Sequence, residues 1–228
     1  MSERIGDSIS ELPAKSKGDV AHALAKAGLS LIPIAGGSAV ELFQLLVQPP
    51  LEKRREEWMQ AVGERLQQLE EHGLKLEDLQ TNEQFVSAVM YVTQAAMRTH
   101  VVAKREALCN AILNVAVGQA PDETVQYLLL SFIDDLTEMH LRILKVFHQP
   151  TVPQGISMGG LSTVLEQAIP DLRNRRDVYD QLWKDLYARG LVNTEGLHFT
   201  MSGSGLASRR TTGLGEALLQ FISAPNAL

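Results

Sequence analysis

Apolar residues recur at intervals of three and four along most of the chain. This spacing is typical of amphipathic helices that bury one face. Clear stripes lie within residues 51–69, 85–99 and 125–136. The connections between them are short, which favours antiparallel packing of neighbouring helices. We therefore expect residues 18–136 to form an antiparallel helical bundle, preceded by a flexible tail, 1–17, that lacks any periodicity.

Capping residues, glycines and prolines mark the expected helix boundaries. Gly73 and Gly118 each follow a stripe, where glycine commonly ends a helix. Thr81 with Gln84 matches the capping box, in which the first residue caps the helix and the second reaches back to it. Pro49–Pro50 predicts the end of one short helix and the start of the next.

An apolar segment, residues 27–47, precedes those prolines. Its first part, Ala27 to Val40, has no charged side chain and is broken by Pro33 and by Gly36–Gly37. It is too short and too broken to span a membrane, which takes about 20 apolar residues. The candidate contact residues in this segment are Leu31, Ile32, Ile34, Phe43 and Leu46.

Three roles for the apolar segment stay open at this point. It is the central helix of the bundle, or it meets a membrane or a protein partner, or it is stored in the core and released on a trigger, with the proline and glycine breaks as hinges. A helix that lies on a membrane surface usually carries lysine and arginine on its polar face. Only Lys26 precedes this segment, and the charged block after it has three acidic and three basic residues.

Residues 137–228 differ in pattern and predict a winged-helix-like module. A helix, a short helix and a longer helix are followed by two short strands around a turn at Ser202–Gly205, and then by a last helix. The four helices are expected at residues 141–147, 161–169, 177–189 and 214–222. The fold class is therefore mainly α: an N-terminal antiparallel helical bundle with a C-terminal winged-helix-like module that contains a small β-hairpin.

Six basic residues around the third helix and the wing of this module are candidate nucleic-acid contacts: Arg173, Arg175, Arg176, Lys184, Arg209 and Arg210. Residues 151–228 nevertheless hold seven basic and seven acidic residues, and Asp177, Asp180 and Asp185 lie in the helix that would enter the groove. Domains that read DNA are usually clearly basic. A protein-contacting module is the preferred interpretation, and a DNA-binding regulator is the alternative.

Composition narrows the classes of partner and the cellular location that the sequence allows. The chain of 228 residues is 45% hydrophobic, with a net charge of −6, so it has no overall attraction to nucleic acid or to anionic membranes. Its single cysteine allows no internal disulfide, and its polar first residues do not resemble a secretory signal. We expect a cytoplasmic protein, with a membrane-peripheral location as the alternative.

Catalytic and cofactor motifs are missing from the sequence. The six histidines form no HExxH motif, a single cysteine supplies no cysteine pair for zinc, and the glycines match neither GxGxxG nor a P-loop. Cys109 with His100 is the one candidate nucleophile pair, yet the helical pattern around Cys109 is typical of a buried thiol. We expect no cofactor, no metal and no small-molecule substrate; an enzyme using His100 and Cys109 is the second alternative.

Four segments carry a resemblance to known proteins. They are PIAGG at 33–37, PPLEKRREEW at 49–58, KREALCNAILN at 104–114 and EMHLRILKVF at 138–147. In this order, over residues 28–148, the chain resembles a group of uncharacterised bacterial proteins and, more distantly, the Abi-alpha family of abortive phage infection. The resemblance implies a bacterial helical protein, cytoplasmic or membrane-peripheral, in phage defence. Its motifs contain no catalytic residues, so it assigns no site.

The sequence therefore predicts a non-enzymatic interaction or effector protein. It would act through the apolar segment and the winged-helix face on a protein partner, on its own copy or on a membrane. Protein contact or self-association is preferred over membrane binding, and both are preferred over nucleic acid.

Overall fold

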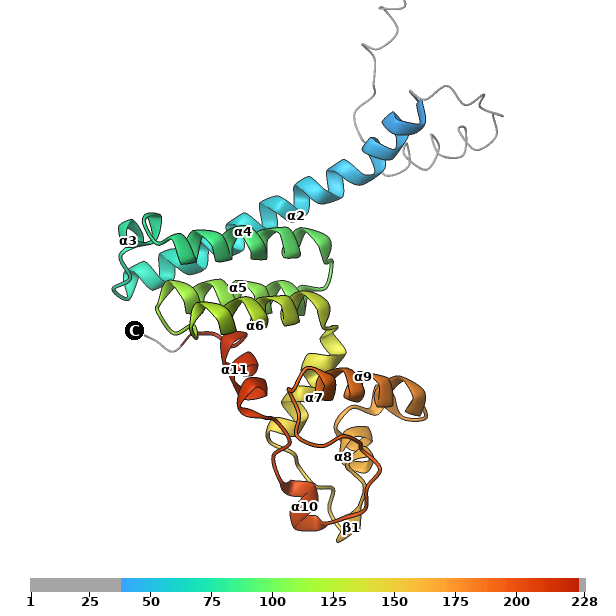
Figure 1. Cartoon of the computed structure of the whole chain (residues 1–228). Coiled ribbons are helices and arrows are strands. Elements are labelled where there is room, and N and C mark those ends of the chain that lie inside the picture. The colour runs from blue at the N-terminus through green and yellow to red at the C-terminus, as the bar shows by residue number, and fades with distance from the viewer. Residues whose placement is uncertain (1–37, 226–228) are drawn as a thin grey trace, which may run out of the picture. The chain divides into compact units, whose positions relative to one another are not determined.

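A computed structural model describes residues 38–225 of the chain (Figure 1). The chain divides into two compact units, residues 1–50 and 51–228. The described residues form ten α-helices and one two-stranded antiparallel sheet, so the mainly helical fold class is confirmed. The second unit contains helices from both of the domains that the sequence predicts.

The elements up to residue 136 are all helical. They are α2 (Ser38–Glu71), α3 (Leu76–Gln80), α4 (Glu83–Arg98), α5 (Val102–Ala116) and α6 (Glu123–Asp135). The elements after residue 136 are α7 (Glu138–His148), β1 (Met158–Gly159), α8 (Leu161–Ala168), a 3₁₀ turn (Pro170–Leu172), α9 (Arg176–Ala188), β2 (Met201–Ser202), α10 (Gly203–Ala207) and α11 (Gly213–Phe221).

Glycine ends the predicted helices as expected, but one N-cap differs. Gly73 and Gly118 have positive φ angles of 107° and 70°, the conformation that ends a helix and that glycine adopts without steric cost. The cap of α4 is Asn82, whose side chain accepts a hydrogen bond from the Phe85 N–H. The predicted Thr81–Gln84 box is wrong because Gln84 donates instead to Gln126, across to α6.

The predicted helix stop at Pro49–Pro50 is also wrong, since α2 runs from Ser38 to Glu71. Each proline lacks the N–H that would bond to the carbonyl four residues earlier, so the carbonyls of Leu45 and Leu46 lose their helical partners. The side chains of residues 48–53 are all exposed. Water can therefore donate hydrogen bonds to these two carbonyls, and the helix tolerates both prolines.

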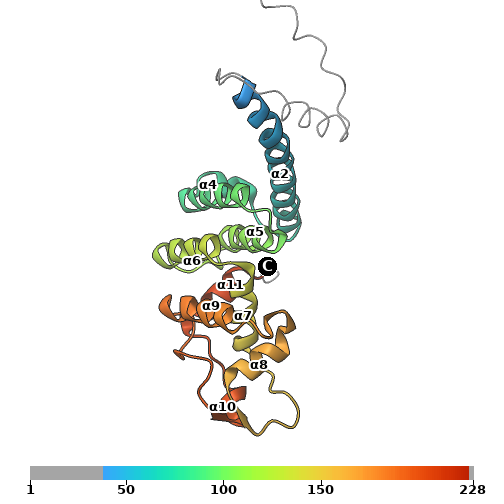
Figure 2. The ribbon, with the colours of Figure 1, turned by 90° about the vertical axis from the view of Figure 1, so that its right-hand side faces the viewer.

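The core of the second unit is centred on α5. This helix packs against α4, α6 and α11, and α4 also packs against α6 (Figures 1 and 2). Nine of the fifteen residues of α5 are buried, including Ala111 and Ile112, which have no exposed surface. The buried residues all lie within 107–116, where Asn110 alone is half-buried, so this part of α5 is enclosed on nearly all sides.

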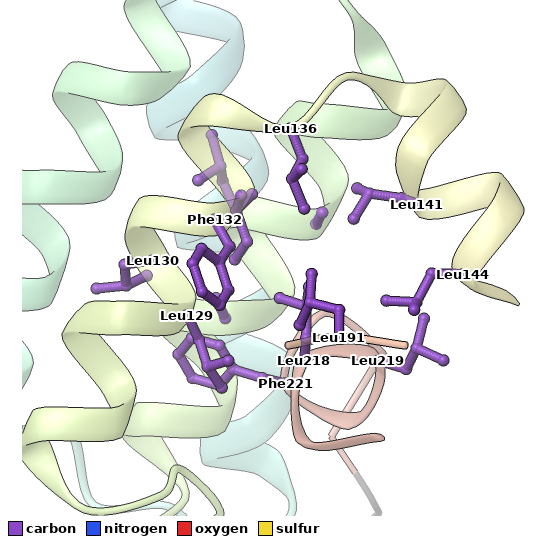
Figure 3. Packing of buried hydrophobic residues seen from close by; sticks show 14 of the residues in the cluster. Leu129, Leu130, Phe132, Leu136, Leu141, Leu144, Leu191, Leu218, Leu219 and Phe221 are labelled. Atoms are coloured by element: carbon purple, nitrogen blue, oxygen red, sulfur yellow. The ribbon is translucent and has the colours of Figure 1, made fainter. Parts of the chain in front are cut away.

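The same core continues into the C-terminal helices. Side chains from α6, α7 and α11 meet in one apolar layer, with Leu191 among them (Figure 3). The close approach of α11 depends on Gly215, because a Cβ atom at this position would lie 2.2 Å from the Leu191 carbonyl oxygen. Within the same part of the chain, the rings of Phe147 and Trp183 pack edge to face, with centroids 4.8 Å apart.

The predicted hairpin is replaced by a different arrangement. Residues 203–207 form α10, capped by the Ser202 hydroxyl, where the sequence predicted a turn. β2 pairs with β1 from before α8, and a single bridge joins Val192 to Thr211. Serine followed by small residues suits a helix N-cap as well as a turn, so sequence pattern did not separate the two.

Candidate functional site

Apolar side chains cover most of the circumference of α2 over residues 41–47. Phe43 is 64% exposed, Leu45 49% and Leu46 39%. At 100° per residue, Glu41 and Gln44 lie on the opposite side of the helix from Phe43 and Leu46. This part of α2 therefore presents a wide apolar face, hereafter the apolar face of α2, beside a narrow polar stripe.

The exposure of side chains 41–50 distinguishes a core helix from a contact helix in the described part of the apolar segment. None of residues 41–50 is buried, so the described part of the segment is not a core helix. The predicted contact residues Phe43 and Leu46 are both accessible, whereas Leu31, Ile32 and Ile34 lie outside the described residues. Over residues 38–225, no helix combines the length and apolar character needed to cross a membrane.

Most of the predicted nucleic-acid contact residues form hydrogen bonds or ion pairs with other residues of the same chain. Arg176 pairs with Asp180 at 3.3 Å, and Arg209 pairs with Glu216. Arg210 is half-buried and donates to the Gly205 carbonyl. In addition, Arg173 donates to the Glu166 carbonyl at 3.1 Å, so four of the six candidate side chains already have partners.

Arg175 and Lys184 are exposed, and within residues 38–225 neither takes part in an ion pair or a side-chain hydrogen bond. They do not form a continuous basic surface, because exposed Asp177 and half-buried Asp180 stand between them on α9. Asp180 also bonds to His198 at 2.7 Å. The structure thus brings acidic groups among the basic ones over this helix.

Next to Asp180 in the sequence, Tyr179 contacts a second acidic residue, Glu166. The Tyr179 hydroxyl donates to a Glu166 carboxylate oxygen at 3.1 Å. Burial, followed by this hydrogen bond to Glu166, raises the pKa of Tyr179 to about 12. Tyr179 is therefore a neutral donor at physiological pH, and its role here is to hold α8 against α9.

His100 and Cys109 are not brought together. Cys109 is 2% exposed, and burial raises the pKa of its thiol. His100 is exposed in the connection before α5, and Cys109 lies seven residues after the first residue of that helix, about 10 Å along its axis. Among residues 38–225, no group of three histidine, cysteine or acidic side chains is placed to hold a metal ion.

Sequence reasoning missed a buried polar contact on α5. The Asn114 amide donates to the carbonyls of Phe221 and Ser223, at 3.0 and 2.9 Å, and Asn114 is 4% exposed. The Asn110 amide donates to the Ile222 carbonyl at 2.9 Å. Together these asparagines, the asparagine clamp, satisfy carbonyls at the C-terminal end of α11. Two asparagines four residues apart within the otherwise apolar stretch 107–116 were the signal for such a contact.

Three of the cavities lined by residues 38–225 lie beside α5, and Glu106 lines each of these three. The largest has a volume of about 440 Å³ and lies between α2, α5 and residues 224–225. Its lining combines polar side chains with an apolar floor, a composition typical of small-molecule sites.

Comparison with protein-family models, with curated proteins and with solved structures finds no match. The resemblance to the Abi-alpha family therefore stays a prediction from the sequence.

Proposed function

We propose that the protein is a non-enzymatic interaction protein that binds a second copy of itself through the apolar face of α2. The observation that carries this proposal is the exposure of Phe43, Leu45 and Leu46 on one helix. Full burial of such a side chain from water contributes about 1.5–3 kcal/mol, and these three side chains can gain the share that their exposed surface represents. Together they supply part of the free energy that would hold two chains together.

Charge favours a protein contact over a membrane surface. Glu41 is the only charged residue in 38–50, so two copies of this face meet with little repulsion. A membrane-surface helix would instead be expected to carry lysine or arginine on its polar stripe. The winged-helix-like order of α7 to α11, with its neutralised α9, suits a further protein contact better than a DNA groove. The effector role in phage defence is proposed from the sequence resemblance.

The test uses the full chain and two variants of α2. Phe43→Asp with Leu46→Asp places charge in the apolar face, and Gln44→Asp places one charge in the polar stripe as the matched control. We expect the mass in solution, measured by light scattering over a range of concentrations, to be dimeric or larger for wild type and for Gln44→Asp. The double variant is expected to be a monomer with an unchanged circular dichroism spectrum.

Two outcomes contradict this proposal. A wild-type chain that stays monomeric and floats with liposomes would make the apolar face a membrane contact. A wild-type chain that stays monomeric and binds no liposomes would leave the face without this role. The effector role is tested separately, by comparing phage plaque numbers on cells that express wild type or the double variant.

A further inference from the structure

The cavity of about 440 Å³ between α2, α5 and residues 224–225 carries an inference that does not depend on self-association. Its walls are two helices that present polar residues at helical spacing: Arg65, Gln68 and His72 from α2, and Glu106 and Asn110 from α5. Leu69, Leu113, Ala224 and Pro225 supply apolar surface to the same cavity. Its volume of about 440 Å³ falls within the usual range for small-molecule sites, roughly 300–1,000 Å³.

Arg65 is the central basic group of this cavity. Its side chain is held in place because one guanidinium nitrogen donates to Asn110 Oδ1 at 2.9 Å. It is half-buried, yet within residues 38–225 no carboxylate lies within ion-pair distance of it. The guanidinium also lies within hydrogen-bonding reach of the Cys109 thiol. The planar N–H groups of a guanidinium match the two oxygens of a carboxylate.

Glu106 supplies the opposite charge. It lines the same cavity on α5, one helical turn before Asn110, and is exposed. It forms no ion pair with Arg65 although both groups act on the neighbouring Cys109 thiol. The cavity therefore holds a separated positive and negative group, which is the arrangement that a zwitterion complements.

His72 adds a third polar group. Its Nδ1 lies 2.7 Å from the Gln68 carbonyl oxygen, and a carbonyl only accepts, so Nδ1 carries a proton. In the neutral ring Nε2 is then an acceptor, which is suited to an N–H or O–H donor of a ligand.

We propose that this cavity binds a free α-amino acid with an apolar side chain. The carboxylate pairs with Arg65, the ammonium group pairs with Glu106, and the side chain packs on Leu69 and Leu113. The site would also report occupancy to the C-terminal helix, because Asn110, which holds Arg65, donates to the Ile222 carbonyl at the end of α11.

The experiment measures binding to the full chain by calorimetry, with L-leucine, its des-amino analogue 4-methylpentanoate and its des-carboxy analogue 3-methylbutylamine. We expect leucine to bind and each analogue to bind at least about tenfold more weakly, since each lacks one of the two charge contacts. Glu106→Gln removes only the negative group; it should weaken leucine binding about tenfold and leave 4-methylpentanoate binding unchanged.

Glu64→Gln is the matched control, because Glu64 is exposed on α2 and does not line the cavity. It removes one carboxylate without changing the site, so leucine binding should equal that of wild type. Arg65→Lys keeps the charge but loses the two-pronged contact, and should weaken both leucine and 4-methylpentanoate. Its urea unfolding curve checks that the fold survives the change.

Two results would overturn the assignment. One is the absence of heat for all three compounds at millimolar concentration with folded wild-type chain. The other is leucine binding by Glu106→Gln and by Arg65→Lys that is as strong as binding by wild type, since the ligand would then bind elsewhere. Neither result bears on the mass of the protein in solution, so this inference and the proposed self-association fail independently.

Discussion

The first part of α2 and residues 107–116 of α5 are alike in sequence and opposite in environment. Both segments are apolar around most of their circumference, so neither has the single stripe of a surface helix. Nine residues of α5 are buried between α4, α6 and α11, whereas none of residues 41–50 is buried. An apolar helix is therefore not by itself evidence of a core position.

Polar anchors mark the difference between the two helices. Within α5, Asn110 and Asn114 satisfy the carbonyls at the end of α11, and such contacts need a fixed neighbour. In the first part of α2 the exposed apolar side chains are accompanied by two prolines, which weaken the helix where solvent reaches the backbone. A buried polar side chain thus indicates a core helix better than apolar content does.

The largest effect tests this contrast directly. Ile112→Ala removes three carbon atoms from a site with no exposed surface, and we expect the free energy of unfolding to fall by about 3 kcal/mol. Leu46→Ala makes a change of similar size on the exposed face of α2, and the expected change is within about 0.5 kcal/mol. Urea unfolding of the two variants at low protein concentration measures both values.

The result that would remove the contrast is a loss of stability at Leu46 as large as that at Ile112. It would mean that the apolar face of α2 is covered within a single chain. Repeating the measurement at high protein concentration then separates such intramolecular cover from self-association, because only the latter depends on concentration.

A smaller effect is expected from the asparagine clamp. Asn114→Leu keeps the size of the side chain but leaves the Phe221 and Ser223 carbonyls without their donor, which should cost about 2 kcal/mol. Hydrogen exchange should also become faster in α11, since this end of the helix is freed. Gln67→Leu, an exposed amide on α2, makes the same chemical change and should leave both measurements unaltered.

The order and type of the helices after residue 50 could be predicted because local signals agreed there. Apolar stripes and the positive-φ glycines Gly73 and Gly118 placed α4 to α6 within a few residues. The errors fall where one local signal supports two structures. Pro49–Pro50 stops most helices but is tolerated at an exposed position, and Ser202 caps α10 instead of opening a turn.

The candidate site was less predictable than the fold. Phe43 and Leu46 were proposed as contact residues from the sequence. Their exposure could not be predicted, because exposure depends on which other elements pack nearby. The cavity between Arg65 and Glu106 joins residues 41 positions apart. Local pattern contains no information on such a contact, so the sequence indicated no small-molecule site.

The smallest expected effect concerns pH and the start of α7. The Nδ1 atom of His140 accepts the Thr137 backbone N–H at 3.1 Å, so the neutral ring carries its proton on Nε2, which lies 3.4 Å from Asp185. Burial lowers the pKa of His140; Arg189 and Lys104 also lower it, while Asp185 opposes them. A second proton on the ring would remove the acceptor of the Thr137 N–H.

Stability should therefore fall on acidification. Since the pKa of His140 is lower in the folded chain than its ordinary value of about 6.5, the unfolded chain takes up the proton first as the pH drops. The stability is complete above about pH 6.5 and is lost between that value and the folded pKa, by up to about 1.4 kcal/mol per pH unit. His140→Gln keeps an acceptor in the capping-box position and should remove this part of the pH dependence. His100→Gln, which replaces an exposed imidazole, should retain this pH dependence. Equal pH profiles for wild type and His140→Gln in urea unfolding would show that the buried ring does not titrate with unfolding.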